Sequence, residues 1–514
     1  MKKQSQIKLL ILLTTLFLAI AISSCQKTKL SESEERKNEI EELNKLLHNK
    51  WANRDVEFVK NNKYIDNLFK QLKGEDLNVL NKTQYVSHID KIIRGLHDGH
   101  LRLTPPDDVQ EISRYSGMKI ARVKEGYALV ACDYENNCKD LNIASIDSIN
   151  SIDSMNSKTS LPLEVIKIDD TEIDTWLLED SKYQYGSTLY GRISQSLERL
   201  YSHVRLPYYI PAKTITLRSF TKSLKSDSKF NNSSNDEFTK EIKWKITNFA
   251  NELHSSKKVQ DTNVNQCSKN GTGWTQKNRK CVVVTDLKNG IYQLKVSTFW
   301  CAFSSDDSEP KTVQNFKDQF NSEIKKIENP KNIILDLRDN GGGGDEEGRN
   351  LAGLFIDDKE FWIKISHLLT GSPWYLKLWS LFDGEWQKPL TVFVSVNKEY
   401  RKKFINSKLF ILTNNNCFST CDVVVSSLKS ANAGLVVGER THGGAGDPNK
   451  WTSPYSNFTV DYPTALVWKK NGELIEGNST DVDLEIIPSI NDYKQHSDPV
   501  LMLLLNKIQM NYTH

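Results

Sequence analysis

The stretch NIILDLRDNGGGGDEEGRNLAGLF, residues 332–355, joins a short apolar run, a glycine-rich loop and a segment of helical character. The same order recurs at residues 409–412, an apolar run that a loop connects to a predicted helix over about 420–433, and residues 435–438 form a third apolar run. Buried strands that alternate with helices are typical of a largely parallel sheet with helices on its faces. The sequence therefore predicts an α/β core.

The regions before this core have different patterns. Residues 38–108 show helical periodicity in their first part and predict a helical N-terminal region. Over residues 109–190 the apolar runs become short and predict strands. Within them, LPLEVIKIDD at 161–170 resembles the strand and turn of PDZ-like domains. The core then spans residues 191–500, with a polar insertion at about 221–290 that is rich in Lys, Ser and Asn.

The N-terminus is typical of an export signal. Three lysines precede the apolar run 9–22, which is short for a membrane span but suits a signal peptide over residues 1–24. The run ends in ISSC, which resembles a bacterial lipobox, so Cys25 is the expected site of lipidation. Residues 25–37 are then a tether. We expect a lipid-anchored protein of the bacterial cell envelope, in the outer membrane or facing the periplasm, with the cell surface as a further alternative.

Charge excludes one class of partner. Three of the 68 basic residues lie in the signal peptide, which leaves 65 against 65 acidic residues in the mature chain. Such a balance gives no basic footprint for nucleic acid. The sequence also has no pattern typical of a cofactor or metal site, so we expect neither.

Seven cysteines remain after Cys25. Two pairs flank short polar loops and predict disulfides in an exported protein, Cys132–Cys138 and Cys267–Cys281. We expect the other three to be free thiols, and a bond between Cys417 and Cys421 would be a surprise because it would clamp the helical turn around Ser419.

Ser419 is the first candidate for chemistry. It lies between the run 409–412 and the predicted helix, where free N–H groups and the helix dipole favour negative charge. The Thr420 N–H could then stabilise an oxyanion. The alternative is that Ser419 is an N-cap, as many serines at helix starts are.

The loop Gly341-Gly342-Gly343-Gly344 is the second candidate, because glycines let the backbone approach a ligand closely. It lacks the patterns of phosphate-binding loops, which leaves a flexible turn or half of an oxyanion hole. The segment LHDGHLRL at 96–103 is the third candidate, since it holds His97 and His100 next to a predicted strand. A metal site on these two histidines is an alternative with little support, because no carboxylate-rich ligand set follows.

Several segments resemble one family, the tail-specific (C-terminal processing) peptidases. Segments 334–343, 417–422 and 438–445 are similar to its LDLRxNxGG, TFSAxE and GExTxGGA motifs, and 476–485 resembles EGxGVxPDxxV with Thr480 and Val482 replacing the usual Val and Pro. Segment 96–101 matches the LxDGHT motif of the branch with tricorn-type core proteases and retinoid-binding-protein-like repeats. The resemblance covers roughly residues 40–490 and implies a ClpP/crotonase-like core.

The resemblance also implies a site. Gly444 stands where the branch with a Ser–Lys dyad has its lysine, so the resemblance implies the other branch, with Ser419 as nucleophile, His100 as base and Glu476 as the acid. It places the oxyanion hole at the amides of Thr420 and of Gly342 or Gly341, and it leaves His442 as a reserve candidate for the base. The expected function is a serine peptidase whose PDZ-like segment binds an extended peptide. The alternative is a catalytically inactive peptide- or ligand-binding protein of the same fold.

Overall fold

The computed structural model describes twelve segments of the chain: residues 30–55, 69–70, 77, 79–109, 111–132, 162–206, 211–218, 237–246, 280–302, 308–357, 359–369 and 386–510. The predicted signal peptide and Cys25 lie outside them. Within these segments, no helix combines the length and the apolar character that crossing a membrane requires.

The core sheet has the strand order β11-β12-β13-β16-β17-β21. The bounds are β11 (Val282–Asp286), β12 (Ile291–Val296), β13 (Asn332–Asp336), β16 (Lys408–Thr413), β17 (Leu435–Gly438) and β21 (Leu484–Glu485). β11 and β12 form an antiparallel pair, and every other neighbouring pair is parallel. All residues of β13 are buried, as expected for a parallel strand covered on both faces. The predicted α/β core with a largely parallel sheet is confirmed.

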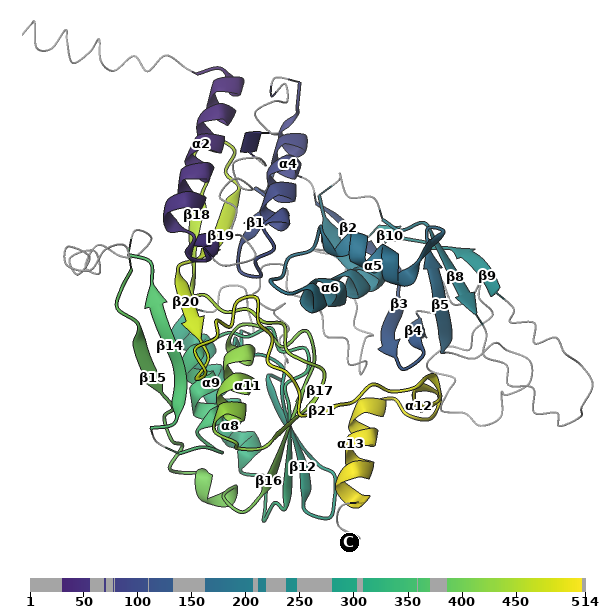
Figure 1. Cartoon of the computed structure of the whole chain (residues 1–514), viewed down its shortest axis with the longest axis vertical. Coiled ribbons are helices and arrows are strands. Elements are labelled where there is room, and N and C mark those ends of the chain that lie inside the picture. The colour runs from purple at the N-terminus through teal and green to yellow at the C-terminus, as the bar shows by residue number, and fades with distance from the viewer. Residues whose placement is uncertain are drawn as a thin grey trace, which may run out of the picture.

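Helices cover both faces of the core sheet (Figure 1). Ile333 and Leu335 of β13 pack in the cluster that includes α8 (Glu309–Ile324), α9 (Asp345–Ala352) and α11 (Thr420–Ser430). Ile334, between them, belongs to the opposite cluster with α13 (Pro499–Met510). This alternation follows from the two-residue period of a strand. The remaining elements of this region are β14 (Phe361–His367), β15 (Leu390–Phe393), η6 (Arg401–Lys403), β20 (Ala465–Trp468) and α12 (Ile490–Gln495).

The N-terminal unit packs two helices beside a small sheet at the top of Figure 1. It contains α2 (Glu32–Lys50), η1 (Ala52–Asp55), α4 (Lys82–Gly95) and β1 (Arg102–Thr104), and β1 pairs with β19 (Thr459–Pro463), which pairs with β18 (Pro448–Thr452). Strand β1 thereby ties the segment after His100 to the C-terminal part of the core. Helix α2 starts inside the segment predicted as a tether, because Ser31 and Glu34 form a capping box.

The β-rich unit lies beside the core and carries the sheet order β3-β4-β5-β8-β9. Its elements are β2 (Ile112–Tyr115), β3 (Met118–Val123), β4 (Gly126–Cys132), β5 (Leu163–Ile168), β6 (Thr171–Glu172), α5 (Ile173–Ser181), α6 (Leu189–Tyr201), β7 (Ser202–Arg205), β8 (Thr214–Arg218), β9 (Glu237–Glu241) and β10 (Lys245–Ile246). The sheet extends beyond residue 190, the end that the sequence predicts for this unit. The polar segment 221–290 contains β9 and β10. Exposed residues alternate with partly buried ones along β9, which explains its polar composition.

Two disulfides differ from the prediction. Cys281 is bonded to Cys301, so the predicted Cys267–Cys281 bond is wrong. The reason is strand pairing: Val282 lies opposite Val296, which brings the start of β11 next to the chain beyond β12. Cys132 is disulfide-bonded, and its predicted partner Cys138 lies outside the described residues.

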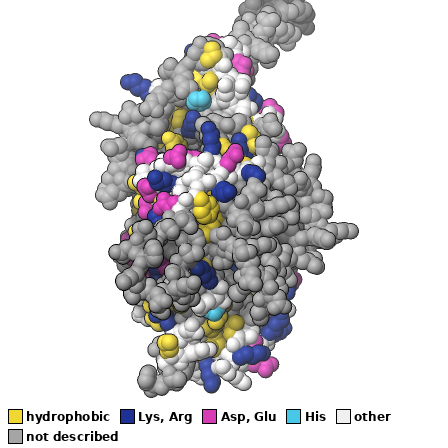
Figure 2. All heavy atoms as spheres, turned by 90° about the vertical axis from the view of Figure 1, so that its right-hand side faces the viewer, with side chains coloured by type: hydrophobic (Ala, Val, Ile, Leu, Met, Phe, Trp, Pro, Cys, Tyr) yellow, Lys and Arg dark blue, Asp and Glu magenta, His cyan; other side chains and the backbone are white. Residues whose placement is uncertain are grey.

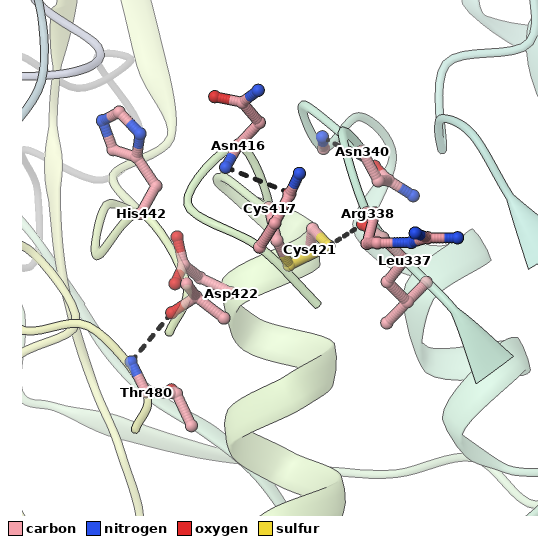
Figure 3. The surroundings of a disulfide bond; sticks show 12 residues. Leu337, Arg338, Asn340, Asn416, Cys417, Cys421, Asp422, His442 and Thr480 are labelled. Carbon is pink, nitrogen blue, oxygen red and sulfur yellow. Dashed lines mark hydrogen bonds between the residues drawn. A yellow bond between two sulfur atoms is a disulfide. The ribbon is translucent and has the colours of Figure 1, made fainter. Parts of the chain in front are cut away.

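Cys417 is bonded to Cys421, so the prediction that both are free thiols is also wrong. Figure 3 shows this bond between the segment Leu337–Asn340 on one side and Asp422 and His442 on the other. The first turn of α11 brings the two α-carbons to 5.3 Å, within the usual range for a disulfide.

On the face turned to the viewer in Figure 2, the described Lys and Arg side chains are interspersed with Asp and Glu. This distribution agrees with the balanced composition of the chain.

Candidate active site

Ser419 lies at a sharp turn between β16 and α11. Its φ is +60° and its ψ is −124°. Residues other than glycine rarely adopt this backbone conformation, which costs about 1–3 kcal/mol. Its N–H donates to Gly444 O at 3.0 Å, which helps to hold the turn. The hydroxyl makes no capping bond to the helix, so Ser419 is not the ordinary N-cap that the sequence left open.

The Ser419 hydroxyl instead meets His100. The distance from His100 Nε2 to Ser419 Oγ is 3.0 Å. The imidazole is 8% exposed and stacks on the Phe418 ring, with centroids 4.4 Å apart. A histidine and a serine at this distance are the arrangement in which imidazole can remove the hydroxyl proton.

Asp98 fixes the segment that carries His100. Its Oδ1 accepts the N–H of His100 at 2.7 Å and that of Leu101 at 3.1 Å. Its Oδ2 accepts from Trp51 Nε1 at 2.7 Å and from Asn53 Nδ2 at 2.8 Å. The carboxylate thus connects the end of α2 to the turn before β1 and sets the backbone direction of His100.

Glu476 is fully buried next to these residues. Its Oε2 accepts the Ala445 N–H at 3.0 Å, and its Oε1 accepts the Ser187 hydroxyl. One oxygen of Glu476, one of Asp98 and one ring nitrogen of His100 all lie within 4.8 Å of one another. Among the described residues His100 Nδ1 is buried without a hydrogen-bond partner, so the Glu476 carboxylate lies near the imidazole but is not bonded to it. Catalytic hydrogen bonds are often long in proteins without bound substrate.

Burial dominates the electrostatics of the site. It lowers the pKa of His100 to about 3, with Arg102 and His442 adding to the effect. Burial, and then the nearby Asp98 carboxylate, raise the pKa of Glu476 well above its ordinary value. The free site therefore holds a neutral imidazole, the form that accepts a proton.

The glycine loop lies directly against the nucleophile. A Cβ on Gly342 would come within 2.7 Å of Ser419 Cβ and 3.1 Å of Thr420 N. Its own N–H donates to Asn340 Oδ1 at 2.9 Å, so this amide, one of the two predicted for the oxyanion hole, already has a partner. For Gly341, a Cβ would meet nothing within 4 Å.

The next amide, that of Gly343, has a different orientation. The Gly342 carbonyl accepts from the Phe299 N–H at 2.9 Å and from the Thr298 hydroxyl. In a trans peptide the following N–H points the opposite way, so the Gly343 N–H is directed away from β12. Neither this N–H nor that of Thr420 has a hydrogen-bond partner within the described segments.

The other two histidines do not join this cluster through hydrogen bonds. His97 Nε2 lies 3.3 Å from Lys182 O. His442 Nδ1 lies 3.0 Å from Asn415 O, and its buried ring packs against Gly186 and Gly191. His442 is near enough to lower the pKa of His100, but among the described residues the Ser419 hydroxyl is hydrogen-bonded to His100 and not to His442.

Two contributors to the site were missed in the sequence. Asp422 accepts the N–H groups of Gly443 and Gly444 at 3.1 Å, which fixes the loop whose carbonyl holds Ser419. Its position, three residues after the nucleophile where the TFSAxE motif has an acid, was the available signal. Ser187 contacts Glu476 from the β-rich unit, and no motif surrounds it.

The group Asp98, His100 and Glu476 has the composition of a metal site, but its donors do not fit one. Each Asp98 oxygen already accepts two N–H bonds. Nε2 of His100 faces Ser419. The arrangement suits proton transfer rather than metal ligation.

A serine on a strand-to-helix turn, hydrogen-bonded to histidine, is the arrangement of serine hydrolases. Residues 293–486 match the model of Peptidase family S41. This match confirms the resemblance to the tail-specific peptidases that the motifs predicted and supports a serine-type peptidase. The matched segment includes Ser419 and Glu476 but not His100.

Solved structures show the same fold over nearly the whole chain. Mature CPAF is 15% identical, covers 93% of this chain and 97% of its own, and gives a TM-score of 0.64. CPAF complexed with lactacystin is 15% identical and gives 0.61, over 93% and 98% of the two chains. The photosystem II D1 C-terminal processing protease is 13% identical over 90% and 94% of the two chains and gives a lower TM-score of 0.41. No curated protein matches the chain in sequence.

Proposed function

We propose that this protein is an exported, lipid-anchored peptidase that hydrolyses peptide bonds through an acyl-enzyme on Ser419, with His100 as base and Glu476 as the acid of the triad. The observation that carries the proposal is the 3.0 Å distance between His100 Nε2 and Ser419 Oγ, on a turn whose backbone conformation is strained.

The first half of the reaction forms the acyl-enzyme. His100 removes the Ser419 proton while Oγ attacks the peptide carbonyl carbon, and the carbonyl oxygen becomes an oxyanion. The N–H of Thr420 and that of Gly343 are the donors proposed for this oxyanion, in place of the Gly342 amide predicted from sequence. The protonated His100 then gives its proton to the leaving amine as the C–N bond breaks.

The second half releases the product. His100 removes a proton from water, which attacks the ester carbonyl, and the proton returns to Ser419 as the acid leaves. Glu476 acts when His100 carries its positive charge, because a carboxylate beside a buried imidazolium stabilises it. If substrate binding brings the Glu476 carboxylate closer to His100 Nδ1, the two groups would form a direct hydrogen bond.

The β-rich unit is the proposed site for the peptide beyond the scissile bond. β3 is an edge strand of its sheet among the described residues, and α6 packs beside it. Arg122 of β3 lies 3.6 Å from Glu439, which immediately follows β17, so this strand contacts the carboxyl end of the core sheet. An extended peptide could pair with such an edge through main-chain hydrogen bonds.

The export and anchoring parts of the proposal rest on residues 1–25 alone. The basic start, the apolar run 9–22 and ISSC support lipidation of Cys25 and a place in the bacterial cell envelope. Mass spectrometry of the membrane fraction should find the diacylated Cys25 peptide, and a Cys25→Ala protein that still partitions fully with membranes would contradict the anchor.

Active-site labelling tests the catalytic part. A fluorophosphonate should label the wild-type protein at Ser419 and leave Ser419→Ala unlabelled, and the wild type should cleave members of a mixed peptide library. Lactacystin, with which mature CPAF forms a complex, is a second probe and should compete with the label. A folded wild-type protein that neither labels nor cleaves any peptide would instead indicate a binding protein.

A further inference from the structure

We propose that Ser187 is a positioning residue of the active site, which orients Glu476 from the β-rich unit. The proposal rests on the function proposed above, because it assigns a role toward the acid of that triad. Ser187 lies in the turn between α5 and α6, and 289 residues separate it from Glu476.

The Ser187 hydroxyl contacts both the segment that carries His100 and the side chain of Glu476. Ser187 Oγ donates to Glu476 Oε1 and accepts the Gly99 N–H at 3.2 Å. Gly99 immediately precedes His100. Ser187 is 7% exposed and Glu476 1%, so water has little access to replace either bond.

The hydroxyl also completes the set of donors around the Glu476 carboxylate. Oε2 is held by the Ala445 N–H, from the loop beside Ser419. Without Ser187, Glu476 would keep only backbone donors, from Ala445 and Gly99, in a buried site next to Asp98, and a buried carboxylate with fewer donors takes up a proton more readily. A neutral Glu476 cannot stabilise the His100 imidazolium.

The turn that holds Ser187 is itself fixed against the core. The hydroxyl of the next residue, Thr188, donates to His442 O at 2.6 Å and accepts the Gly191 N–H at 3.1 Å. The active site is therefore assembled from three units: the core supplies Ser419 and Glu476, the N-terminal unit supplies His100, and the β-rich unit supplies Ser187. Docking of the β-rich unit therefore supplies the side-chain donor to the acid.

The test compares Ser187→Ala with Ser196→Ala in the full-length protein. Ser196 is a buried serine of the same unit whose hydroxyl donates to Arg192 O within its own helix, which makes it a matched control. We expect Ser187→Ala to lower kcat about 10- to 100-fold, the effect of a lost bond to a charged group, with KM changed less than about threefold. Ser196→Ala should stay within about twofold of the wild type.

Two further readouts separate positioning from general damage. The acidic limb of the kcat/KM profile should move to higher pH in Ser187→Ala, because Glu476 loses a donor to its anion. In a Glu476→Gln background, the same substitution should cost less than about threefold, since the two residues act together. If Ser187→Ala does not fold, Ser187→Thr should retain activity, and Ser187→Val, whose side chain is isosteric with that of threonine, should lose it.

Wild-type kcat in Ser187→Ala, an unchanged acidic limb, or an equal loss in the Glu476→Gln background would overturn the proposal. Failure of the proposed function itself would show differently, as a wild-type protein that a fluorophosphonate does not label at Ser419.

Discussion

His100 Nε2 lies 3.0 Å from Ser419 Oγ, although 319 residues separate the two in the chain. The contact depends on pairing of β1 with β19, which docks the N-terminal unit on the core. It supports His100 as the proposed base over His442, whose Nδ1 faces Asn415 O.

The first prediction follows from this contact. His100→Ala should lower kcat/KM about as much as Ser419→Ala, because members of a triad act as a unit. His97→Ala is the matched control and should stay within about threefold, since within the described segments the His97 ring nitrogen lies near Lys182 O and not near Ser419. Steady-state kinetics on a cleaved library peptide measures both, and an active His100→Ala with an inactive His442→Ala would show that the base was misassigned.

Two neighbouring glycines should respond in opposite ways. Gly341→Ala should keep nearly full activity, because its Cβ would point into open space. Gly342→Ala should lose most activity, since its Cβ would come within 2.7 Å of Ser419 Cβ and its φ of +94° disfavours a side chain. Rates and thermal unfolding of the two variants provide the comparison, and equal activity would rule out close packing of this loop on the nucleophile.

The pH dependence should depend on Glu476. Activity needs a neutral His100 and an ionised Glu476, and the pKa of His100 is lowered to about 3 whereas that of Glu476 is raised. As the pH falls, the wild-type pair takes up its first proton above the ordinary glutamic acid range, and activity is lost there. In Glu476→Gln only His100 titrates, so the acidic limb should move to lower pH.

The maximal kcat/KM of Glu476→Gln should also be about 10²–10⁴-fold lower than that of the wild type, as when the acid of other triads is replaced. Profiles of kcat/KM from about pH 3 to 9 test both effects, because this range extends from the lowered pKa of His100 to the raised pKa of Glu476. An acidic limb at the same pH in both proteins would mean that Glu476 does not control the site.

The Cys417–Cys421 disulfide should matter more for activity than for stability. Its loop is short, with a sequence separation of 4, so chain entropy gives a stabilisation of only about 2 kcal/mol. The Cys281–Cys301 bond, with a separation of 20, should contribute about 3 kcal/mol. Yet Cys417 and Cys421 flank the strained turn of Ser419 on both sides.

We therefore expect Cys417→Ala/Cys421→Ala to lower kcat more than Cys281→Ala/Cys301→Ala does, while losing less free energy of unfolding. Urea unfolding and kinetics on the two double variants decide the order. A wild-type kcat in the first variant would show that the turn holds its conformation without the bond.

Much of the core could be predicted from the sequence, because parallel strands buried on both faces leave apolar runs such as 333–337 and 409–412. Ser419 could be predicted for the same reason, since it follows such a run and precedes a helix. His100 and Glu476 were accessible only through motifs of a known family, because nothing local links them to Ser419.

The rest depends on three-dimensional contacts. Ser187 meets Glu476 across two units, and a single serine in a turn gives no signal of its own. Cys281 pairs with Cys301 because of the register of β11 on β12, which loop composition does not reveal. The choice of Gly343 over Gly342 in the loop requires the orientation of one peptide plane.

The central claim is that Ser419 attacks the peptide carbonyl. The most direct measurement is hydrolysis of a library peptide that the wild type cleaves, repeated with Ser419→Ala at equal concentration and with thermal unfolding as the check on folding. The account predicts that the variant folds normally, forms no acyl-enzyme visible by intact mass, and loses at least about 10³-fold in kcat. Activity within twofold of the wild type would contradict it.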